Sequence, residues 1–238
     1  MQLRGIAARC TAAVLLFSWA ALTSRGQSFQ DLDFEAPTFV PAGSGYQGSV
    51  DPDLALPGWT AYWGTTPAPF ILHDNEFLDS AGISILDTNG LYGYSLLSQT
   101  LEGQYTLLLQ GGFSLTSYPN RQSVAVAQTG QIPSWARSMT FLVSGQNFDV
   151  SVGGQSRPLI NGDSVDVSAF AGQTVEIRFT AFPQPPPGLA INFVYLDDIS
   201  FSPVSVPEPA TIGLLLAAFL LLALCRADRP RFCRRGAR

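Results

Sequence analysis

Apolar residues in the middle of this 238-residue chain recur at every second position, in short runs. Between Thr174 and Thr180, Val175, Ile177 and Phe179 alternate with polar or charged residues. Because successive side chains of a β-strand point to opposite faces of a sheet, this pattern predicts a strand with one buried face. No segment of the middle keeps the 3.6-residue apolar period of an amphipathic helix. The pattern therefore predicts an all-β domain.

Other short apolar runs are bounded by turn residues, and they predict further strands at 105–109, 124–127, 139–143 and 191–195. In the last of these, Ile191, Phe193 and Tyr195 are expected to share one face. The run 148–152 leads into Gly153-Gly154, which predicts a two-residue hairpin turn because both glycines tolerate positive φ. Such strands, closely spaced along the chain, favour a β-sandwich or barrel.

The middle of the chain, residues 27–205, is strongly acidic and contains no cysteine. It holds sixteen Asp and Glu residues against four Arg residues, a balance of −12, and the whole chain has no Lys. This charge argues against nucleic-acid binding, which needs a basic surface. The three cysteines, Cys10, Cys225 and Cys233, lie towards the two ends. The middle must therefore be stabilised by an apolar core rather than by disulfides or a cysteine-based zinc site.

The N-terminal segment, residues 1–26, has the three parts of a secretory signal peptide. Arg4 and Arg9 supply positive charge, an apolar run extends from Cys10 to Leu22, and Ser24-Arg25-Gly26 places small residues before a cut at Gln27. The alternative is an uncleaved membrane anchor, which the shortness of the apolar run disfavours. We expect the chain to be exported.

The C-terminal segment, residues 206–238, combines three features in order. Pro207-Glu208-Pro209 precedes an uncharged run from Ala210 to Cys225, and six Arg residues with one Asp follow. As a helix the run would be about 24 Å long, slightly short of the ~30 Å hydrocarbon core. The flanking charge predicts a transmembrane helix at about 210–225 with its Arg-rich end in the cytoplasm.

This ordered combination resembles the PEP-CTERM sorting signal of Gram-negative bacteria. The sorting motif would be Pro207, Glu208 and Pro209. The resemblance implies recognition and processing by an exosortase, a membrane-embedded cysteine transpeptidase. It also implies an inner-membrane intermediate, followed by delivery to the cell surface or an exopolysaccharide matrix. A plain type I membrane anchor is the alternative.

A second resemblance covers the middle of the chain. The segment Val165–Val175 is similar to a segment of galactose-binding-like jelly rolls, which include carbohydrate-binding modules. Tyr195–Phe201 resembles their last strand, Phe34-Glu35 their first strand, and Trp59 an early core tryptophan. The resemblance implies a single jelly-roll β-sandwich at 27–205, flanked by the signal peptide and the C-terminal helix. This fold hosts many unrelated functions, so it does not assign one.

Most catalytic constellations are excluded by the residue types present. His73 is the only histidine, so a multi-histidine metal site cannot form, and no Lys is available for a Schiff base. No G-x-S-x-G motif occurs. His73 follows an apolar run, and we expect it at a strand end on the surface or in a loop. A pair of carboxylates for glycoside hydrolysis is left open by the sequence.

Two kinds of binding site follow from the jelly-roll resemblance. It implies a structural Ca²⁺ held by Glu35 with Asp197 or Asp198, although these acids equally fit solvated or turn-capping roles. Sugar binding would use exposed aromatic rings. Tyr62 is one candidate, because in a strand from 59 to 63 its side chain would point to the face opposite Trp59 and Trp63. Trp135, expected in a loop, is the second candidate.

The sequence thus favours a non-catalytic, exported surface or matrix protein that interacts with polysaccharide or contributes to envelope structure. A secreted polysaccharide hydrolase, or an accessory domain of one, is the first alternative. A ligand-free structural coat protein is the second.

Overall fold

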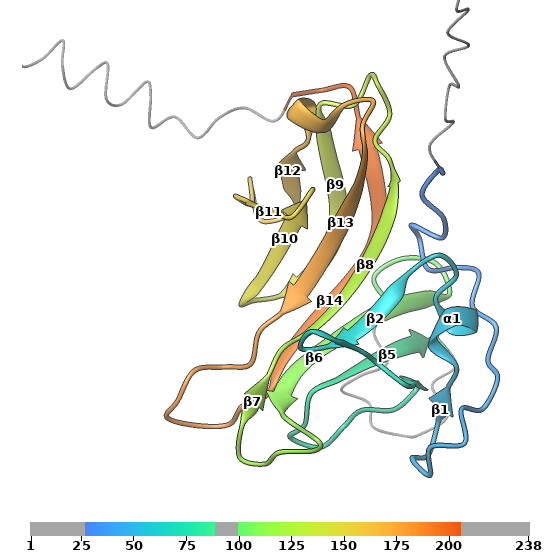
Figure 1. Cartoon of the computed structure of the whole chain (residues 1–238), viewed down its shortest axis with the longest axis vertical. Helices are drawn as coiled ribbons and strands as arrows, with labels where there is room; N and C mark the ends of the chain where they lie inside the picture. Colours follow the sequence, from blue (N-terminus) through green and yellow to red (C-terminus); the bar gives the residue numbers. More distant parts are fainter. Residues whose placement is uncertain (1–26, 89–99, 206–238) are drawn as a thin grey trace, which may run out of the picture.

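The computed structural model describes residues 27–88 and 100–205, which form a β-sandwich of two packed sheets (Figure 1). The expected signal peptide and the C-terminal segment with Pro207, Glu208 and Pro209 lie outside the described residues. Within those two ranges, no helix is long and apolar enough to cross a membrane.

The first sheet has eight strands in the order β1-β4-β5-β6-β14-β9-β12, and the short strand β7 pairs with β6. All neighbours are antiparallel except β4 and β5, which run parallel. The bounds are β1 Ser49–Val50, β4 Ile71–His73, β5 Gly82–Asp87, β6 Tyr105–Phe113, β7 Arg121–Gln122, β9 Ser138–Gly145, β12 Ser164–Asp166 and β14 Asn192–Ser202.

The second sheet has six antiparallel strands in the order β11-β10-β13-β8-β2-β3. Their bounds are β2 Thr60–Trp63, β3 Thr66–Pro67, β8 Val124–Gln131, β10 Phe148–Val152, β11 Gln155–Arg157 and β13 Thr174–Ala181. Two short helices complete the described part: α1 (Pro52–Ala55), which Asp51 caps, and the 3-10 helix η1 (Ser168–Phe170).

The alternation expected at Thr174–Thr180 is confirmed by β13. Ile177 and Phe179 are buried, whereas Arg178 between them is partly exposed. The Phe179 ring lies 5.2 Å from Phe141 of the first sheet and 6.3 Å from Trp59. Trp59 is therefore a core residue, as expected, and the contact of Phe179 with Phe141 joins the two sheets.

The predicted hairpin at Gly153-Gly154 is confirmed. Val152 pairs with Gln155, so the two glycines alone form the turn between β10 and β11. Their φ values of +58° and +74° are the left-handed conformations that a type I′ turn requires. Glycine adopts them without the steric cost of a Cβ atom.

The strand expected at 191–195 is present as β14, and Phe193 and Tyr195 share one of its faces as expected, but the other face is the buried one. Val194 and Leu196 point into the core, whereas Phe193 and Tyr195 on the other face are only partly buried. Because both faces of this strand carry large apolar residues, period-two alternation does not identify the inner one. The buried Asn192 on the inner side donates hydrogen bonds to backbone carbonyls, which offset the cost of its burial.

The expectation of a first strand at Phe34-Glu35 was wrong, because the chain turns there. Phe34 has φ +55° and its amide donates to the carbonyl of Asp31. Its ring is fully buried, 5.6 Å from the Trp59 ring. The positive φ of Phe34 lies outside the β region, so a strand cannot continue through this residue.

Candidate functional site

His73 is the last residue of β4, at the strand end that the sequence predicts, but it is not a simple surface residue. Its side chain is only 23% exposed, and its ring stacks on Phe39 with 3.6 Å between ring centroids. Its backbone amide donates to the carbonyl of Gly48. The histidine ring is therefore held in a fixed orientation by packing and by its strand.

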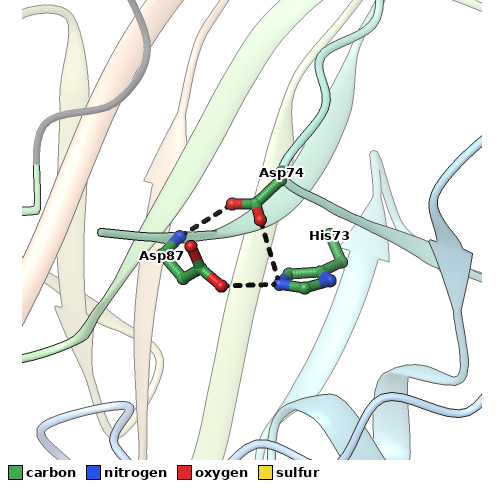
Figure 2. Close-up of side chains that lie close together, drawn as sticks. All are labelled: His73, Asp74 and Asp87. Atoms are coloured by element: carbon green, nitrogen blue, oxygen red, sulfur yellow. Dashed lines mark hydrogen bonds and ion pairs between the residues drawn. The ribbon is translucent and has the colours of Figure 1, made fainter. Parts of the chain in front are cut away.

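Two carboxylates converge on His73. The Nε2 atom lies 3.2 Å from Oδ2 of Asp74 and 3.4 Å from Oδ2 of Asp87 (Figure 2). Asp74 follows β4 directly, and Asp87 ends β5. The parallel pairing of β4 with β5 matches His73 with Ile85, so the two strands end side by side and bring these residues together.

Asp74 holds the cluster together through its two oxygens. Oδ1 accepts a 2.8 Å hydrogen bond from the Asp87 amide, whereas Oδ2 is buried and has no hydrogen-bond partner in the described part of the chain. The Asp74 side chain is only 4% exposed. Burial raises the pKa of Asp74, and the nearby carboxylate of Asp87 raises it further, while His73 and the amide hydrogen bond oppose that shift.

An open cleft of about 510 Å³ lies beside this cluster, along β1. Phe39, Tyr46 and His73 are its aromatic lining residues, and the other described lining residues all lie within 41–50. Among the described residues, none that lines it carries a carboxylate. The cleft therefore combines flat apolar rings with backbone polar groups.

Tyr46 presents the most exposed of these rings. The residue is 48% exposed, and its ring stacks on Phe70 at 5.2 Å with an interplanar angle of 23°. Phe77 contacts it edge-on at 5.5 Å. Because Phe70 and Phe77 are buried, they support Tyr46 from behind and leave part of its surface open to solvent.

The predicted calcium ligand Glu35 is engaged with the backbone. Its Oε1 atom accepts hydrogen bonds from the amides of Gln104 and Tyr105, at 2.7 and 2.9 Å. The neighbouring Gly103 leaves the space for this contact, because a Cβ atom there would collide with the Glu35 carboxylate. Glu35 thus anchors the loop that leads into β6.

The predicted ligand Asp197 holds the same loop from another side. Its fully buried carboxylate accepts hydrogen bonds from the Thr106 hydroxyl at 2.5 Å and from the amides of Glu102 and Asp198, at 3.3 and 2.9 Å. Asp198 is exposed and has φ +42°, at a register shift in β14. The structure therefore brings Glu35 and Asp197 to one loop, each with hydrogen-bond donors as partners.

These donors limit what the two carboxylates offer to calcium. A Ca²⁺ ion takes six to eight oxygen ligands. Here one carboxylate oxygen of Glu35 and both of Asp197 already accept hydrogen bonds from N–H or O–H groups. Of the described residues, only His73, Asp74 and Asp87 form a group of three or more His, Cys, Asp or Glu ligand atoms with metal-like spacing. Calcium binding at Glu35 with Asp197 or Asp198 stays a prediction.

Burial shifts the acidity of two carboxylates near this loop. It raises the pKa of Asp197 to about 6, against the lowering effect of its hydrogen bonds. It also raises the pKa of Asp31 to about 6, and the charges of Asp33 and Glu35 add to this shift. One oxygen of Asp31 is buried, with no hydrogen-bond partner among the residues that the structure describes.

The two aromatic residues proposed for sugar contact lie elsewhere. Tyr62 on β2 is partly buried, and the guanidinium carbon of Arg178 lies 4.3 Å from the centre of its ring. Arg178 therefore covers one face of that ring. Trp135 lies between β8 and β9, in a loop as predicted, and is 53% exposed. Neither residue lines the cleft beside β1.

No protein-family model matches this chain. No curated protein matches it either. Among solved structures, it is similar to the carbohydrate-binding module TmCBM61 in complex with β-1,4-galactotriose, with 13% identity, a TM-score of 0.37, and coverage of 74% of this chain and 97% of the module. It is also similar to the apo form of a cyclase from Fischerella sp., with 14% identity, a TM-score of 0.38, and coverage of 73% and 93%. These distant likenesses assign no function.

The sequence carried little signal for the His73 cluster and the cleft. His73 and Asp74 are adjacent, but Asp87 comes fourteen positions after His73, and no known motif links the three. Only the parallel pairing of β4 with β5 brings them together. The Gly-rich segment 43–48 that lines the cleft was the one local hint of an irregular, exposed loop.

Proposed function

We propose that this chain is an exported, non-catalytic β-sandwich protein that binds polysaccharide at the cell surface or in an exopolysaccharide matrix. The observation that carries the binding proposal is the open cleft beside β1, in which a half-exposed Tyr46 ring is supported by Phe70. The export proposal rests on the sequence of the two ends of the chain.

The cleft suits a sugar for two physical reasons. The apolar C–H face of a pyranose packs on a flat aromatic ring, and Tyr46 offers such a ring at the cleft wall. Because Phe70 and Phe77 already hold the ring, little conformational entropy is lost when a ligand packs on it. Polar groups of Gln47 and Ser49 in the lining can fix the orientation of hydroxyl groups.

The lining of the cleft favours binding over hydrolysis. Glycoside hydrolysis normally requires two carboxylates that flank the scissile bond, and none of the described residues that line this cleft carries one. Asp197 has the raised pKa of a general acid, but its side chain is fully buried and cannot reach a substrate from this position. A secreted polysaccharide hydrolase is therefore the weaker alternative, and a ligand-free coat protein is the third.

The proposed route to the surface uses both ends of the chain. The signal peptide at 1–26 would direct export, and the helix expected at about 210–225 would hold an inner-membrane intermediate. An exosortase would then process the chain near Pro207-Glu208-Pro209. The strongly acidic domain would stay soluble at the surface and repel its own copies.

A glycan array followed by calorimetry tests the binding proposal. We expect Tyr46→Ala to weaken the binding of a glycan that the wild-type protein recognises by more than tenfold. Tyr118→Ala is the matched control, because Tyr118 is 75% exposed and does not line the cleft. Tyr62→Ala and Trp135→Ala test the two contacts predicted from sequence.

Three outcomes would contradict the proposal in different ways. Equal loss of affinity in the Tyr46→Ala and Tyr118→Ala variants would remove the cleft as the binding site. Release of shorter sugars, abolished by substitution of one carboxylate, would establish the hydrolase alternative. Failure to bind any arrayed or matrix polysaccharide would favour the coat-protein alternative.

A further inference from the structure

We propose that His73, Asp74 and Asp87 bind one divalent transition-metal ion of the Zn²⁺ class. This site goes beyond the proposed polysaccharide binding and does not depend on it. It uses one imidazole nitrogen and two carboxylate oxygens, which come from the adjacent ends of β4 and β5 (Figure 2).

The spacing of the three ligand atoms supports a metal rather than a hydrogen-bonded ion pair. Nε2 of His73 lies 3.2 and 3.4 Å from the carboxylate oxygens of Asp74 and Asp87, yet it makes no hydrogen bond with any described residue. A tetrahedral ion with bonds of about 2.0–2.1 Å places its ligand atoms roughly 3.3 Å apart. The three atoms all lie within 4.8 Å of one another, so one ion can contact all of them.

The buried Oδ2 atom of Asp74 is a second observation that points to a cation at this place. Oδ2 lies 3.2 Å from His73 Nε2 and has no hydrogen-bond partner among the described residues, in a side chain that is only 4% exposed. A buried carboxylate oxygen without a partner is costly, and a cation would remove that cost. The other oxygen is fixed by the Asp87 amide, so Oδ2 is already oriented towards the site.

The surroundings hold the imidazole in place. Phe39 stacks on the ring with an interplanar angle of 13°, and the backbone amide of His73 donates to Gly48. Gly48 has φ +76°, and a Cβ atom there would lie 2.8 Å from the His73 carbonyl oxygen. Glycine at this position therefore lets the loop approach β4 closely enough to fix the histidine.

The ligand types select the class of metal. Imidazole with carboxylates suits Zn²⁺ and related transition metals, whereas Ca²⁺ and Mg²⁺ prefer shells made only of oxygen. A dication balances the charges of the two carboxylates. Three protein ligands leave a fourth tetrahedral position for water or another ligand, next to a cleft that His73 also lines.

Metal titration of the full chain in mild detergent tests the site. The three cysteines are first alkylated, because thiolates also bind zinc, and the protein is stripped with EDTA. We expect wild type to bind one more equivalent of Zn²⁺ than His73→Phe, which keeps an aromatic ring on Phe39 but has no ligand nitrogen. Added Zn²⁺ should also raise the Tm of wild type and leave that of the variant unchanged.

A second variant guards against a folding defect. Asp87→Asn removes one ligand charge while it keeps the backbone amide that holds Asp74. Asp163→Asn, an exposed acid outside the cluster, should retain full binding. Equal zinc uptake by wild type and by folded His73→Phe and Asp87→Asn would overturn the proposal. Binding of Ca²⁺ at this same site as tightly as Zn²⁺ would also overturn it.

Discussion

The hydroxyl of Thr106 donates a 2.5 Å hydrogen bond to the carboxylate of Asp197, ninety-one residues further along the chain. Both side chains are fully buried, so the bond joins β6 to β14 inside the protein. The amide of Glu102 donates to the same oxygen. Even with these donors, burial keeps the pKa of Asp197 at about 6, above its ordinary value of 3.8.

This raised pKa predicts how stability depends on pH. Between pH 4 and 6 the folded protein keeps a proton on Asp197 that the unfolded chain releases, and Asp31 behaves in the same way. The free energy of unfolding should therefore fall as pH rises through about 6. Urea denaturation at pH 4.5 and 7.5 measures the difference, in buffer without divalent ions.

Asp197→Asn identifies the group responsible. The amide at position 197 does not titrate, so the stability of the variant should depend less steeply on pH between 4 and 6 than that of wild type. Asp198→Asn removes the same charge from an exposed neighbour and should leave the slope as it is. Equal slopes in wild type and Asp197→Asn would show that Asp197 does not carry the effect.

Local sequence patterns were sufficient where one face of a strand is apolar and the other polar. The alternation around Ile177 and Phe179 predicted β13, and Gly153-Gly154 predicted the hairpin, because both signals depend only on neighbouring residues. In β14 the pattern predicted a strand but not its inner face, since Phe193 and Val194 are both large and apolar.

The candidate metal site could not be predicted from such patterns. His73 belongs to a strand of three residues, too short to show a period, and its partner strand β5 is mostly buried without alternation. The parallel register that places Asp87 near His73 is set by tertiary packing. Likewise, Glu35 reaches the loop before β6 only because the chain turns inward at Phe34.

The calcium prediction can be tested separately from the zinc site. If Ca²⁺ binds Glu35 with Asp197 or Asp198, adding it to EDTA-stripped protein should raise the Tm. At a hundredfold excess of Ca²⁺ over Kd, the folded state should be stabilised by about 2.7 kcal/mol. Glu35→Gln should abolish this effect, and His73→Phe should not. A melting curve that calcium leaves unchanged would exclude the site.

The sorting prediction concerns the C-terminal segment. Combined Pro207→Ala and Glu208→Ala substitutions should leave full-length protein in the inner membrane, because the exosortase would no longer recognise the motif. Wild type should lose its Arg-rich tail on the way to the surface. Mass spectrometry of the surface-exposed protein decides this, and an intact Arg238 terminus would contradict it.

The domain at 27–205 is predicted to fold without either end of the chain. Its apolar core is formed by described residues from both sheets, and the segment contains no cysteine. Purified alone, it should unfold cooperatively, with the same midpoint in the presence and absence of reducing agent. Circular dichroism should show a spectrum dominated by β-structure, and a largely helical spectrum would contradict the fold.

Two neighbouring substitutions in β13 test the sandwich core directly. Phe179 is buried between the sheets against Trp59 and Phe141, so Phe179→Ala should lower the free energy of unfolding by roughly 3–5 kcal/mol. Thr180, the next residue, points to the other face of the strand and is partly exposed. Thr180→Ala should cost well under half as much, measured by urea denaturation of both variants under identical conditions. Equal losses would mean that the two faces of β13 are equally buried, which is incompatible with a sheet that packs its Phe179 side against the opposite sheet.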